Sequence, residues 1–441
     1  MSQVQFYYPL SYNPELLCSS ADVTTVIGLL YNNIIRQDNM MTGIASLSGA
    51  IIASPSVPAD PETDQNYVYD WVRDSAITMH EVIAVAKLDT YSGWCAKLTG
   101  VIKNYIQFTK VVQSHSEDVS LGYARWNLNG TPSANWTVQN DGPALRIIAH
   151  IDAVESGLLS EVVKQQALEN IKVDLNYLVN VYLDSCFNIW EEVYGEHFFT
   201  SKIIRRAFSD CRKYEIFTDF IDSAILDECI SDLEDRMQLH IQGRDYFKSN
   251  ITPGSDGEKG NDKNIDVLLA LLYGEVGKNP EFSIDTSRSM ATSAAVVRSF
   301  ISEYPLNHDD MAIGLGPNLG RYPFDNYDGD TSDHYNIGHP WFISGNAMAA
   351  FFYKIAALAQ SDESLIPRVQ SYFSDVYSQD IESVADIVSL GDRHILTTQR
   401  HWDHCHMSEQ YDRRTGYMKS VRDLTWSYAT YLMAARLRAA L

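Results

Sequence analysis

Apolar residues recur at helical spacing along most of the chain. In the stretch PWFISGNAMAAFFYKIAALAQ, one face of a helix is formed by Met348, Phe351, Phe352, Ile355 and Ala359. Few stretches alternate with the period of two that marks a strand, and no strand–helix–strand rhythm is present. The pattern therefore predicts an all-α fold, with further helices over residues 73–88, 161–183, 220–243, 265–273 and the last twenty residues.

Residues typical of helix ends predict one more helix in the stretch DGPALRIIAHIDAVESG. Asp141 is a type that caps helix N-termini, Pro143 suits the first turn, and Gly157 would close the helix. In the same way, Gly274 is expected to end the helix over residues 265–273.

The segments between the predicted helices are long and rich in Trp, Tyr, Asp, Arg and Gly. Long ordered loops in a compact domain tend to carry function. No Pro/Ser/Thr-rich linker divides the chain, so we expect residues 1–441 to form a single all-α domain with elaborate loops on one face. These loops cover residues 54–71, 119–142, 186–197, 308–341 and 396–420.

Composition narrows the possible ligands. Hydrophobic residues make up 45% of the chain and aromatic residues 11%, including 26 Tyr and 8 Trp. The formal charge of −23 would repel a polyanion and no basic stripe offsets it, so we do not expect nucleic-acid binding. An acidic surface suits a neutral ligand, and surplus aromatic rings suit sugar stacking, although Tyr also fills cores.

The sequence pattern carries no signal for membrane insertion or secretion. No apolar run reaches about 18 residues. Near the N-terminus no basic segment precedes an apolar one, and the first basic residue is Arg36. The six cysteines are scattered without C-x-x-C spacing. We therefore expect a monomer without membrane association, either in a reduced intracellular setting or exported by a route that needs no cleaved signal.

One loop, YVYDWVRDSA, combines flat apolar rings with a charged pair. Arg73 offers forked hydrogen bonds and Asp74 accepts them, while Tyr67 and Trp71 supply ring faces. Sugars need both, because their hydroxyls pair with charged planar groups and their C–H faces lie on aromatic rings. An ion pair at a helix start is the alternative. Trp136 in NWTVQNDGPALR likewise has two interpretations, as a sugar contact or as part of a helix cap.

The loop GRYPFDNYDGDTSDHYNIGHPW carries Arg321, Tyr327 and Trp341 among four aspartates. Aspartate oxygens are hard ligands that suit calcium. An EF-hand would need glycine at the sixth position counted from Asp328, and that position is not glycine. A solvated acidic loop is the simpler interpretation.

The stretch HWDHCHMSEQYDRRTG clusters His, Asp and Cys residues. Zinc ligands normally come as separated pairs, whereas these are consecutive. We therefore predict no metal site and no cofactor. Glu409 is the more informative acid in this stretch, and Tyr411 and Trp426 could build an aromatic wall around it.

The stretch NIWEEVYGEHFFT places Glu191 and Glu192 side by side. Glycoside hydrolysis needs two carboxyl groups on opposite sides of the scissile bond, about 5 Å apart for retention and about 6.5–9.5 Å apart for inversion. Neighbouring helix residues point about 100° apart, and neighbouring strand residues point to opposite faces. Glu191 and Glu192 are therefore poorly placed to form this pair, and the partner should come from a distant stretch.

Six motifs, in order, resemble the fungal-type glucoamylases of glycoside hydrolase family 15: YVYDWVRDSA, QNDGPALR, IWEEVYGEHFFT, GRYPFD, HPWF and SEQYD…RDLTWSYA. Weaker similarity fills the middle, so the resemblance covers nearly the whole chain. It implies an (α/α)6 barrel, in which six inner helices are ringed by six outer ones and loops at one end form a pocket. The implied activity removes glucose from the non-reducing ends of α-1,4-glucans such as starch, maltodextrin or glycogen, more slowly at α-1,6 branches, with inversion to β-glucose.

Carried over by motif, the resemblance implies that Glu191 is the general acid and Glu409 the general base. Arg73 and Asp74 would clamp the hydroxyls of the terminal glucose, and Tyr67 would stabilise the oxocarbenium-like charge. The remaining implied substrate contacts are Trp71, Trp136, the backbone of Ile189, Trp190, Glu192, Arg321, Tyr327, Trp341 and Trp426.

The chain departs from the family pattern at three places. Asn188 replaces the usual Asp before the acid motif, TVQ after Trp136 lacks the usual arginine, and the loop from Arg321 to Trp341 is extended. No starch-binding module follows, so soluble glucans are expected to be better substrates than raw granules. Two alternatives stay open: a relative that hydrolyses trehalose or an α-1,6-glucan, and a non-catalytic glucan-binding protein, which the presence of both Glu191 and Glu409 disfavours.

Overall fold

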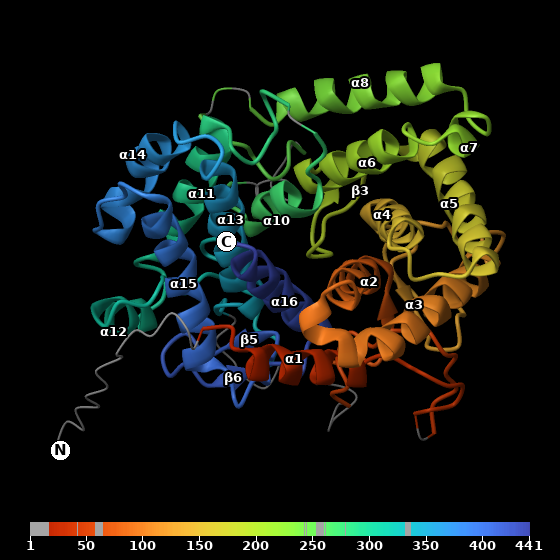
Figure 1. Cartoon of the computed structure of the whole chain (residues 1–441), viewed down its shortest axis with the longest axis horizontal. Coiled ribbons are helices and arrows are strands. Elements are labelled where there is room, and N and C mark those ends of the chain that lie inside the picture. Colours follow the sequence, from red (N-terminus) through yellow and green to blue (C-terminus); the bar gives the residue numbers. More distant parts are fainter. Residues whose placement is uncertain are drawn as a thin grey trace.

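The computed structural model describes residues 17–41, 43–57, 65–241, 243, 245–252, 260, 262–277, 279–330 and 337–441. Within them, six helices close an inner ring, in which each helix packs against the next and the last packs against the first (Figure 1). In chain order the ring consists of α2 (Val72–Ala86), α4 (Asp141–Glu155), α6 (Phe198–Cys211), α10 (Ile265–Tyr273), α13 (Phe342–Ala359) and α16 (Thr425–Ala439).

An outer layer of helices covers this ring. It consists of α1 (Ser20–Asn32), α3 (Ser92–Gln113), α5 (Glu161–Val181), α8 (Ser223–Leu239), α11 (Ser287–Phe300), α14 (Leu365–Tyr377) and α15 (Val384–His401). α3 packs on α2, α5 on α4, α8 on α6, α11 on α10, α15 on α13 and α1 on α16, while α14 contacts α11 and α15. Six described outer helices thus pair with the six inner ones and α14 is an addition to them, so the predicted (α/α)6 barrel is confirmed.

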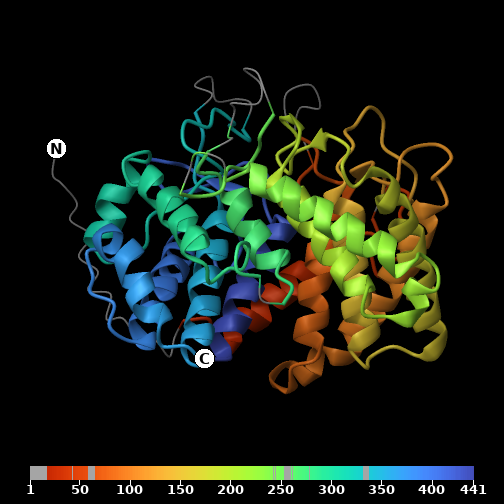
Figure 2. The same ribbon diagram turned by 90° about the horizontal axis from the view of Figure 1, so that it is seen from above.

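The inner helices all begin at the same end of the molecule. Short connections such as residues 87–91 and 156–160 join an inner helix to the outer helix that follows it, so they reverse the chain at the opposite end. The long loops precede the inner helices, and Figure 2 shows them gathered along its upper edge. Helix N-termini carry partial positive charge. This end of the ring therefore favours carboxylate side chains.

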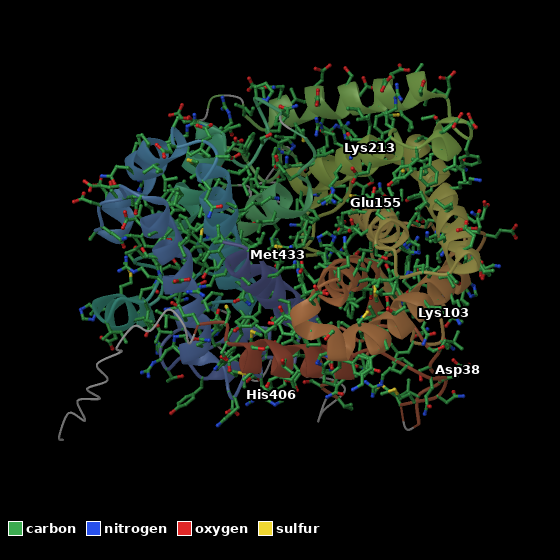
Figure 3. All side chains as sticks on the ribbon, in the orientation of Figure 1. Asp38, Lys103, Glu155, Lys213, His406 and Met433 are labelled. Atoms are coloured by element: carbon green, nitrogen blue, oxygen red, sulfur yellow. The ribbon has the colours of Figure 1, made fainter. Side chains whose placement is uncertain are left out.

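Three short antiparallel ladders brace the loops at the N-terminal end of the ring, within the described residues. β1 (Asp70–Trp71) pairs with β2 (Arg125–Trp126), β3 (Cys186–Phe187) with β4 (Tyr194–Gly195), and β5 (Gln410–Tyr411) with β6 (Met418–Lys419). Short helices complete the connections: η2 (Asp89–Tyr91), α7 (Glu215–Thr218) and α12 (Leu306–Ala312). The charged side chains of Asp38, Lys103 and Lys213 are exposed, and Figure 3 shows Asp38 near the edge of the molecule.

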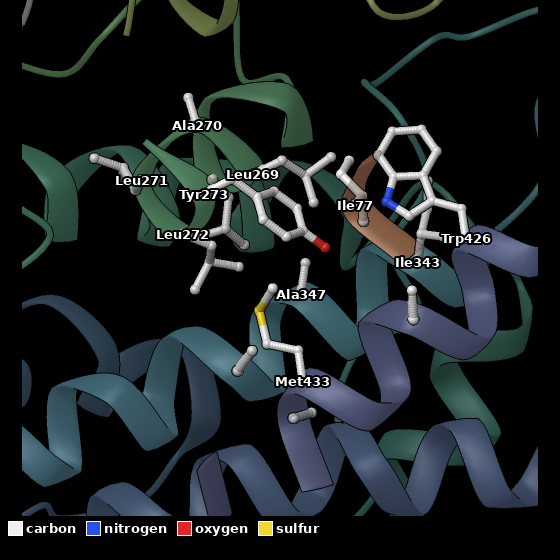
Figure 4. Packing of buried hydrophobic residues seen from close by; sticks show 14 of the residues in the cluster. Ile77, Leu269, Ala270, Leu271, Leu272, Tyr273, Ile343, Ala347, Trp426 and Met433 are labelled. Carbon is white, nitrogen blue, oxygen red and sulfur yellow. The ribbon is translucent and has the colours of Figure 1, made fainter. Parts of the chain in front are cut away.

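Helix α13 is buried on more sides than its sequence pattern predicted, because it packs against α10, α15 and α16. Asn346 is fully buried there and accepts a 2.8 Å hydrogen bond from Thr398 Oγ1. Figure 4 shows Ala347 of this helix close to Met433 and Tyr273, where three inner helices meet. α13 is the one described helix long and apolar enough to cross a membrane, and 83% of it is buried inside the protein.

Several predicted boundaries were wrong. Helix α15 continues to His401, so the loop predicted from residue 396 begins later, and α12 lies partly inside the loop predicted over 308–341. Helix α8 is also shorter than predicted. Asp141 begins α4 without capping it, since the cap residue is Asn140. The Asp141 carboxylate lies 3.7 Å from Arg73 Nη1 instead, because a buried guanidinium needs an anionic neighbour.

Candidate active site

A cavity of about 430 Å³ opens at the N-terminal end of the inner ring. Its size is typical of a small-molecule site. Its lining brings together all the site residues that the family resemblance implied: Tyr67, Trp71, Arg73, Asp74, Trp136, Ile189, Trp190, Glu191, Glu192, Arg321, Tyr327, Trp341, Glu409 and Trp426. Ala53, Gln65, Asn66, Arg125 and Leu424 also line it and were not predicted.

Glu191 is held by nitrogen donors. Its Oε1 accepts hydrogen bonds from Trp71 Nε1 at 2.8 Å and from Trp136 Nε1 at 2.9 Å. Gln139 Nε2 donates to the same oxygen at 3.0 Å. Among the described residues no donor reaches Oε2. The backbone at Glu191 is left-handed, with φ of 62°, a conformation that costs about 1–2 kcal/mol for a residue with a Cβ.

The turn after β3 sustains this strained backbone. The Glu191 N–H donates to the Asn188 carbonyl oxygen at 2.9 Å. Asn188 Oδ1 accepts hydrogen bonds from the N–H groups of Glu192 at 2.9 Å and Val193 at 3.2 Å. Asn188 is itself buried. The residue that departs from the family pattern therefore closes the turn that presents Glu191.

Glu192 has different hydrogen-bond partners from Glu191. Arg321 Nη2 lies 2.9 Å from Glu192 Oε1, and the Tyr322 hydroxyl donates to Oε2 at 2.6 Å. Arg321 in turn makes a forked pair with Asp325, with both N···O distances at 2.7 Å. The two adjacent glutamates thus sit in separate polar networks, as expected for residues that do not act as one pair.

Glu409 directly precedes β5 and is buried among hydroxyl groups. Tyr67 donates to its Oε1 at 2.9 Å, whereas Tyr327 and Ser420 donate to Oε2 at 3.0 Å and 2.5 Å. Burial raises the pKa of Glu409, and the hydroxyl donors oppose that rise because they stabilise the carboxylate. Gly329 packs so closely that a Cβ there would lie 2.6 Å from Glu409 Oε2.

A second charged cluster occupies the first turn of α2. Arg73 Nη2 lies 3.3 Å from Asp74 Oδ2, and Arg73 Nη1 bonds to Gln139 Oε1. Burial raises the pKa of Asp74 to about 6, although Arg73 opposes the shift. Arg73 Nε is buried without a hydrogen-bond partner among the described residues. This cluster therefore encloses one guanidinium N–H that has no acceptor in the described part of the chain.

Tryptophans form the walls between these charged groups. Trp190 stacks on Trp426 with ring centroids 6.2 Å apart and meets Trp341 edge-on at 5.6 Å. Trp71 and Trp136 meet edge-on at 5.8 Å on another side. Such rings offer flat apolar faces beside charged hydrogen-bonding groups, which is the combination that a sugar requires.

One other expectation from the sequence differs from the structure. Tyr411 does not line the cavity: its ring packs on Phe342 at 4.8 Å and its hydroxyl donates to Asn318, because β5 directs it into the core. The histidine-rich stretch is dispersed, with His401 bonded to Asp310 and His406 to Asp423. No group of three or more His, Cys, Asp or Glu residues that could hold a metal is found in the described part of the chain.

The described aspartates of the loop after Arg321 have charged or polar partners. Asp325 binds Arg321, and Asp328 lies 3.1 Å from Lys419 Nζ and 3.2 Å from His339 Nε2. These pairs leave less carboxylate charge for calcium than the sequence suggested. The fourth aspartate of this loop lies outside the described residues.

Three contacts of the site were missed from the sequence. Gln139 lies in the motif QNDGPALR, but nothing in that motif predicts its hydrogen bond to Glu191. Ser420 reaches Glu409 because β6 pairs with β5. Arg125 reaches the cavity because β2 pairs with β1, where Trp71 is its opposite residue. Each depends on pairing between loop segments, which periodicity does not predict.

Comparisons with known proteins agree on one family. A family model described as Glycosyl hydrolases family 15 matches residues 27–436. Glucoamylase 1 of Rhizopus oryzae is 29% identical, covering 89% of this chain and 67% of its own length. A probable glucoamylase of Schizosaccharomyces pombe is 30% identical, covering 94% of this chain and 90% of its own length. The solved glucoamylase of Hormoconis resinae is 25% identical with a TM-score of 0.76, covering 95% of this chain and 73% of that one.

Proposed function

Because the chain belongs to glycosyl hydrolases family 15, we propose that it is an exo-acting glucosidase that releases glucose from the non-reducing ends of α-1,4-glucans. One observation carries the proposal. Two carboxyl groups from distant segments, Glu191 and Glu409, line one tryptophan-walled cavity and have different hydrogen-bond partners. Glycosidases need such a pair, because one group must give a proton while the other takes one.

Glu191 is proposed as the general acid. Its Oε1 is occupied by three N–H donors, and its Oε2 has none among the described residues. A carboxylic acid bonded in this way holds its proton on Oε2, the oxygen that can donate. The rigid donors also fix the orientation of the carboxyl plane, as proton transfer to a glycosidic oxygen requires.

Glu409 is proposed as the general base. Three hydroxyl donors favour its ionised form despite burial. Among the described residues Oε1 accepts from Tyr67 alone, so it retains a lone pair for a water molecule. As that water attacks the anomeric carbon, Glu409 takes its proton and Glu191 protonates the departing oxygen. The bond between the anomeric carbon and that oxygen breaks, and the product is the inverted anomer.

The remaining charged groups are proposed to hold the terminal sugar. Arg73 and Asp74 would pair with its hydroxyls, and Arg321 with Glu192 would do so on the opposite wall. The carboxylate-rich wall and the hydroxyl of Tyr67 would stabilise positive charge at the anomeric carbon. Tryptophan faces would exclude water from the ring. No cofactor takes part in this scheme.

The proposal is tested with isosteric variants. Glu191→Gln and Glu409→Gln should each lower kcat for maltoheptaose by at least about a hundred-fold, since each removes a proton-transfer group. Both should retain maltose binding in calorimetry, because the hydroxyl clamps remain. Glu161→Gln, on the exposed start of α5, is the matched control and should keep full activity. Full activity in both active-site variants would reject the assignment.

A further inference from the structure

Three arginines line the pocket, and one of them differs from the other two. Arg73 and Arg321 are buried and lie within ion-pair distance of carboxylates. Arg125 is only half-buried. Among the residues that the structure describes, no carboxylate comes within ion-pair distance of it. Of the arginines that the structure describes on the pocket wall, Arg125 is therefore the one without an ion-pair partner.

Arg125 is nevertheless held in a fixed place. Its guanidinium carbon lies 3.4 Å from the ring centroid of Trp136 and 4.5 Å from that of Tyr69. Nε donates to Ser133 Oγ at 3.0 Å, and Nη2 points to the Ala134 carbonyl at 3.4 Å. Nη1 has no acceptor in the described part of the chain. A pre-positioned donor thus remains available on the pocket wall.

The surroundings of Arg125 select for a neutral ligand. Partial burial lowers the pKa of Arg125, and an arginine still keeps its charge at any physiological pH. A phosphate or carboxylate ligand would be repelled by the carboxylates of Glu192 and Glu409, which line the same pocket. Sugar hydroxyls meet no such repulsion, and the ring faces of Trp136 and Tyr69 suit their apolar sides.

The position of Arg125 relative to Glu191 indicates which sugar it meets. Trp136, beneath the guanidinium, donates directly to Glu191 Oε1. Glu191 acts on the leaving oxygen in the proposed reaction. Arg73, by contrast, lies in the first turn of α2, where it is almost fully buried. A half-exposed group beside the acid therefore belongs with the departing part of the substrate.

We propose that Arg125 binds hydroxyl groups of the sugar ring on the leaving-group side of the scissile bond, and so selects substrates that carry a second sugar there. This inference rests on the proposed glucosidase function. The competing explanation is that Arg125 only packs on Trp136 and keeps Glu191 in place. The two explanations differ in which substrates an Arg125 variant should affect.

The test compares two substrates whose leaving groups both need a proton from the general acid. Maltose has a sugar as its leaving group, whereas methyl α-D-glucoside has methanol, and both leaving groups need protonation by the acid. For Arg125→Met, kcat/KM for maltose should fall about ten-fold or more, the loss expected for a charge-assisted hydrogen bond. kcat/KM for methyl α-D-glucoside should change less than about two-fold. Arg125→Lys should give an intermediate loss on maltose, because it keeps the charge without the fork.

A matched control replaces another arginine that stacks on an aromatic ring. Arg36 lies 4.5 Å from the ring centroid of Tyr31 and does not line the cavity, so Arg36→Met should leave both substrates unaffected. Equal losses on both substrates in Arg125→Met would overturn the inference in favour of a packing role. No loss on either substrate would also overturn it. A wild-type protein that releases no glucose from maltose would overturn the proposed function, and this inference with it.

Discussion

Ser420 offers the sharpest test of how the proposed base is tuned. Its hydroxyl donates to Glu409 Oε2 at 2.5 Å, the shortest of the three hydroxyl contacts to that carboxylate. Ser420 has φ of 66°, so glycine can take its place without backbone strain. The variant Ser420→Gly therefore removes one hydrogen bond and little else.

The expected effect follows from the direction of the shifts. Burial raises the pKa of Glu409, and the Ser420 hydroxyl lowers it by favouring the carboxylate. Removing that donor should raise the pKa further. A base must be ionised, so the acid limb of kcat/KM should move to higher pH. A hydrogen bond to a charged group contributes about 1.5–3 kcal/mol, and about 1.4 kcal/mol corresponds to one pH unit. We therefore expect the limb to move by roughly one unit or more.

The assay is a pH profile of kcat/KM with maltotriose. Ser378→Gly is the matched control: Ser378 also has a left-handed backbone, with φ of 49°, but it lies exposed at the end of α14. An acid limb that stays still in Ser420→Gly, or moves to lower pH, would refute the proposed tuning of Glu409.

Two further predictions concern stability, measured by chemical denaturation. Phe324 has φ of 61° and is 87% exposed. Phe324→Asn should stabilise the protein by about 0.5–1 kcal/mol, because asparagine tolerates a left-handed backbone better than phenylalanine does. A loss of stability would show that the Phe324 ring makes stabilising contacts. Arg146 pairs with Asp174 in the buried contact between α4 and α5, with Nε 2.7 Å from Oδ2. Arg146→Leu should cost about 3–5 kcal/mol by leaving a buried charge alone, and adding Asp174→Leu should recover much of it; no recovery would contradict this explanation.

Local signals made part of the fold predictable. Helix α10 has its predicted bounds because Asn264 caps its first turn and Gly274 ends it, both short-range effects. Asp141 shows where local reasoning fails. Aspartate is a good capping type, but here its carboxylate lies within ion-pair distance of the buried guanidinium of Arg73 and makes no side-chain cap bond. That guanidinium comes from α2, so a local pattern around Asp141 could not predict it.

Part of the candidate site was likewise predictable from local motifs, and part was not. Glu191 and Trp190 lie within one recognisable motif, and Glu409 within another, so the sequence located both. The contacts that tune them were not predictable, because they join segments that are distant along the chain. Arg125 faces the cavity through the register of β1 with β2, and Ser420 faces Glu409 through that of β5 with β6. Such registers depend on how the loops fold over the ring.

We propose that the protein cleaves single glucose units from chain ends with inversion, using Glu191 as acid and Glu409 as base. The most direct measurement is NMR of the glucose anomer formed from maltoheptaose in the first minutes, before mutarotation. We expect β-glucose together with maltohexaose. Fresh α-glucose, or maltose and maltotriose from cuts inside the chain, would contradict this proposal.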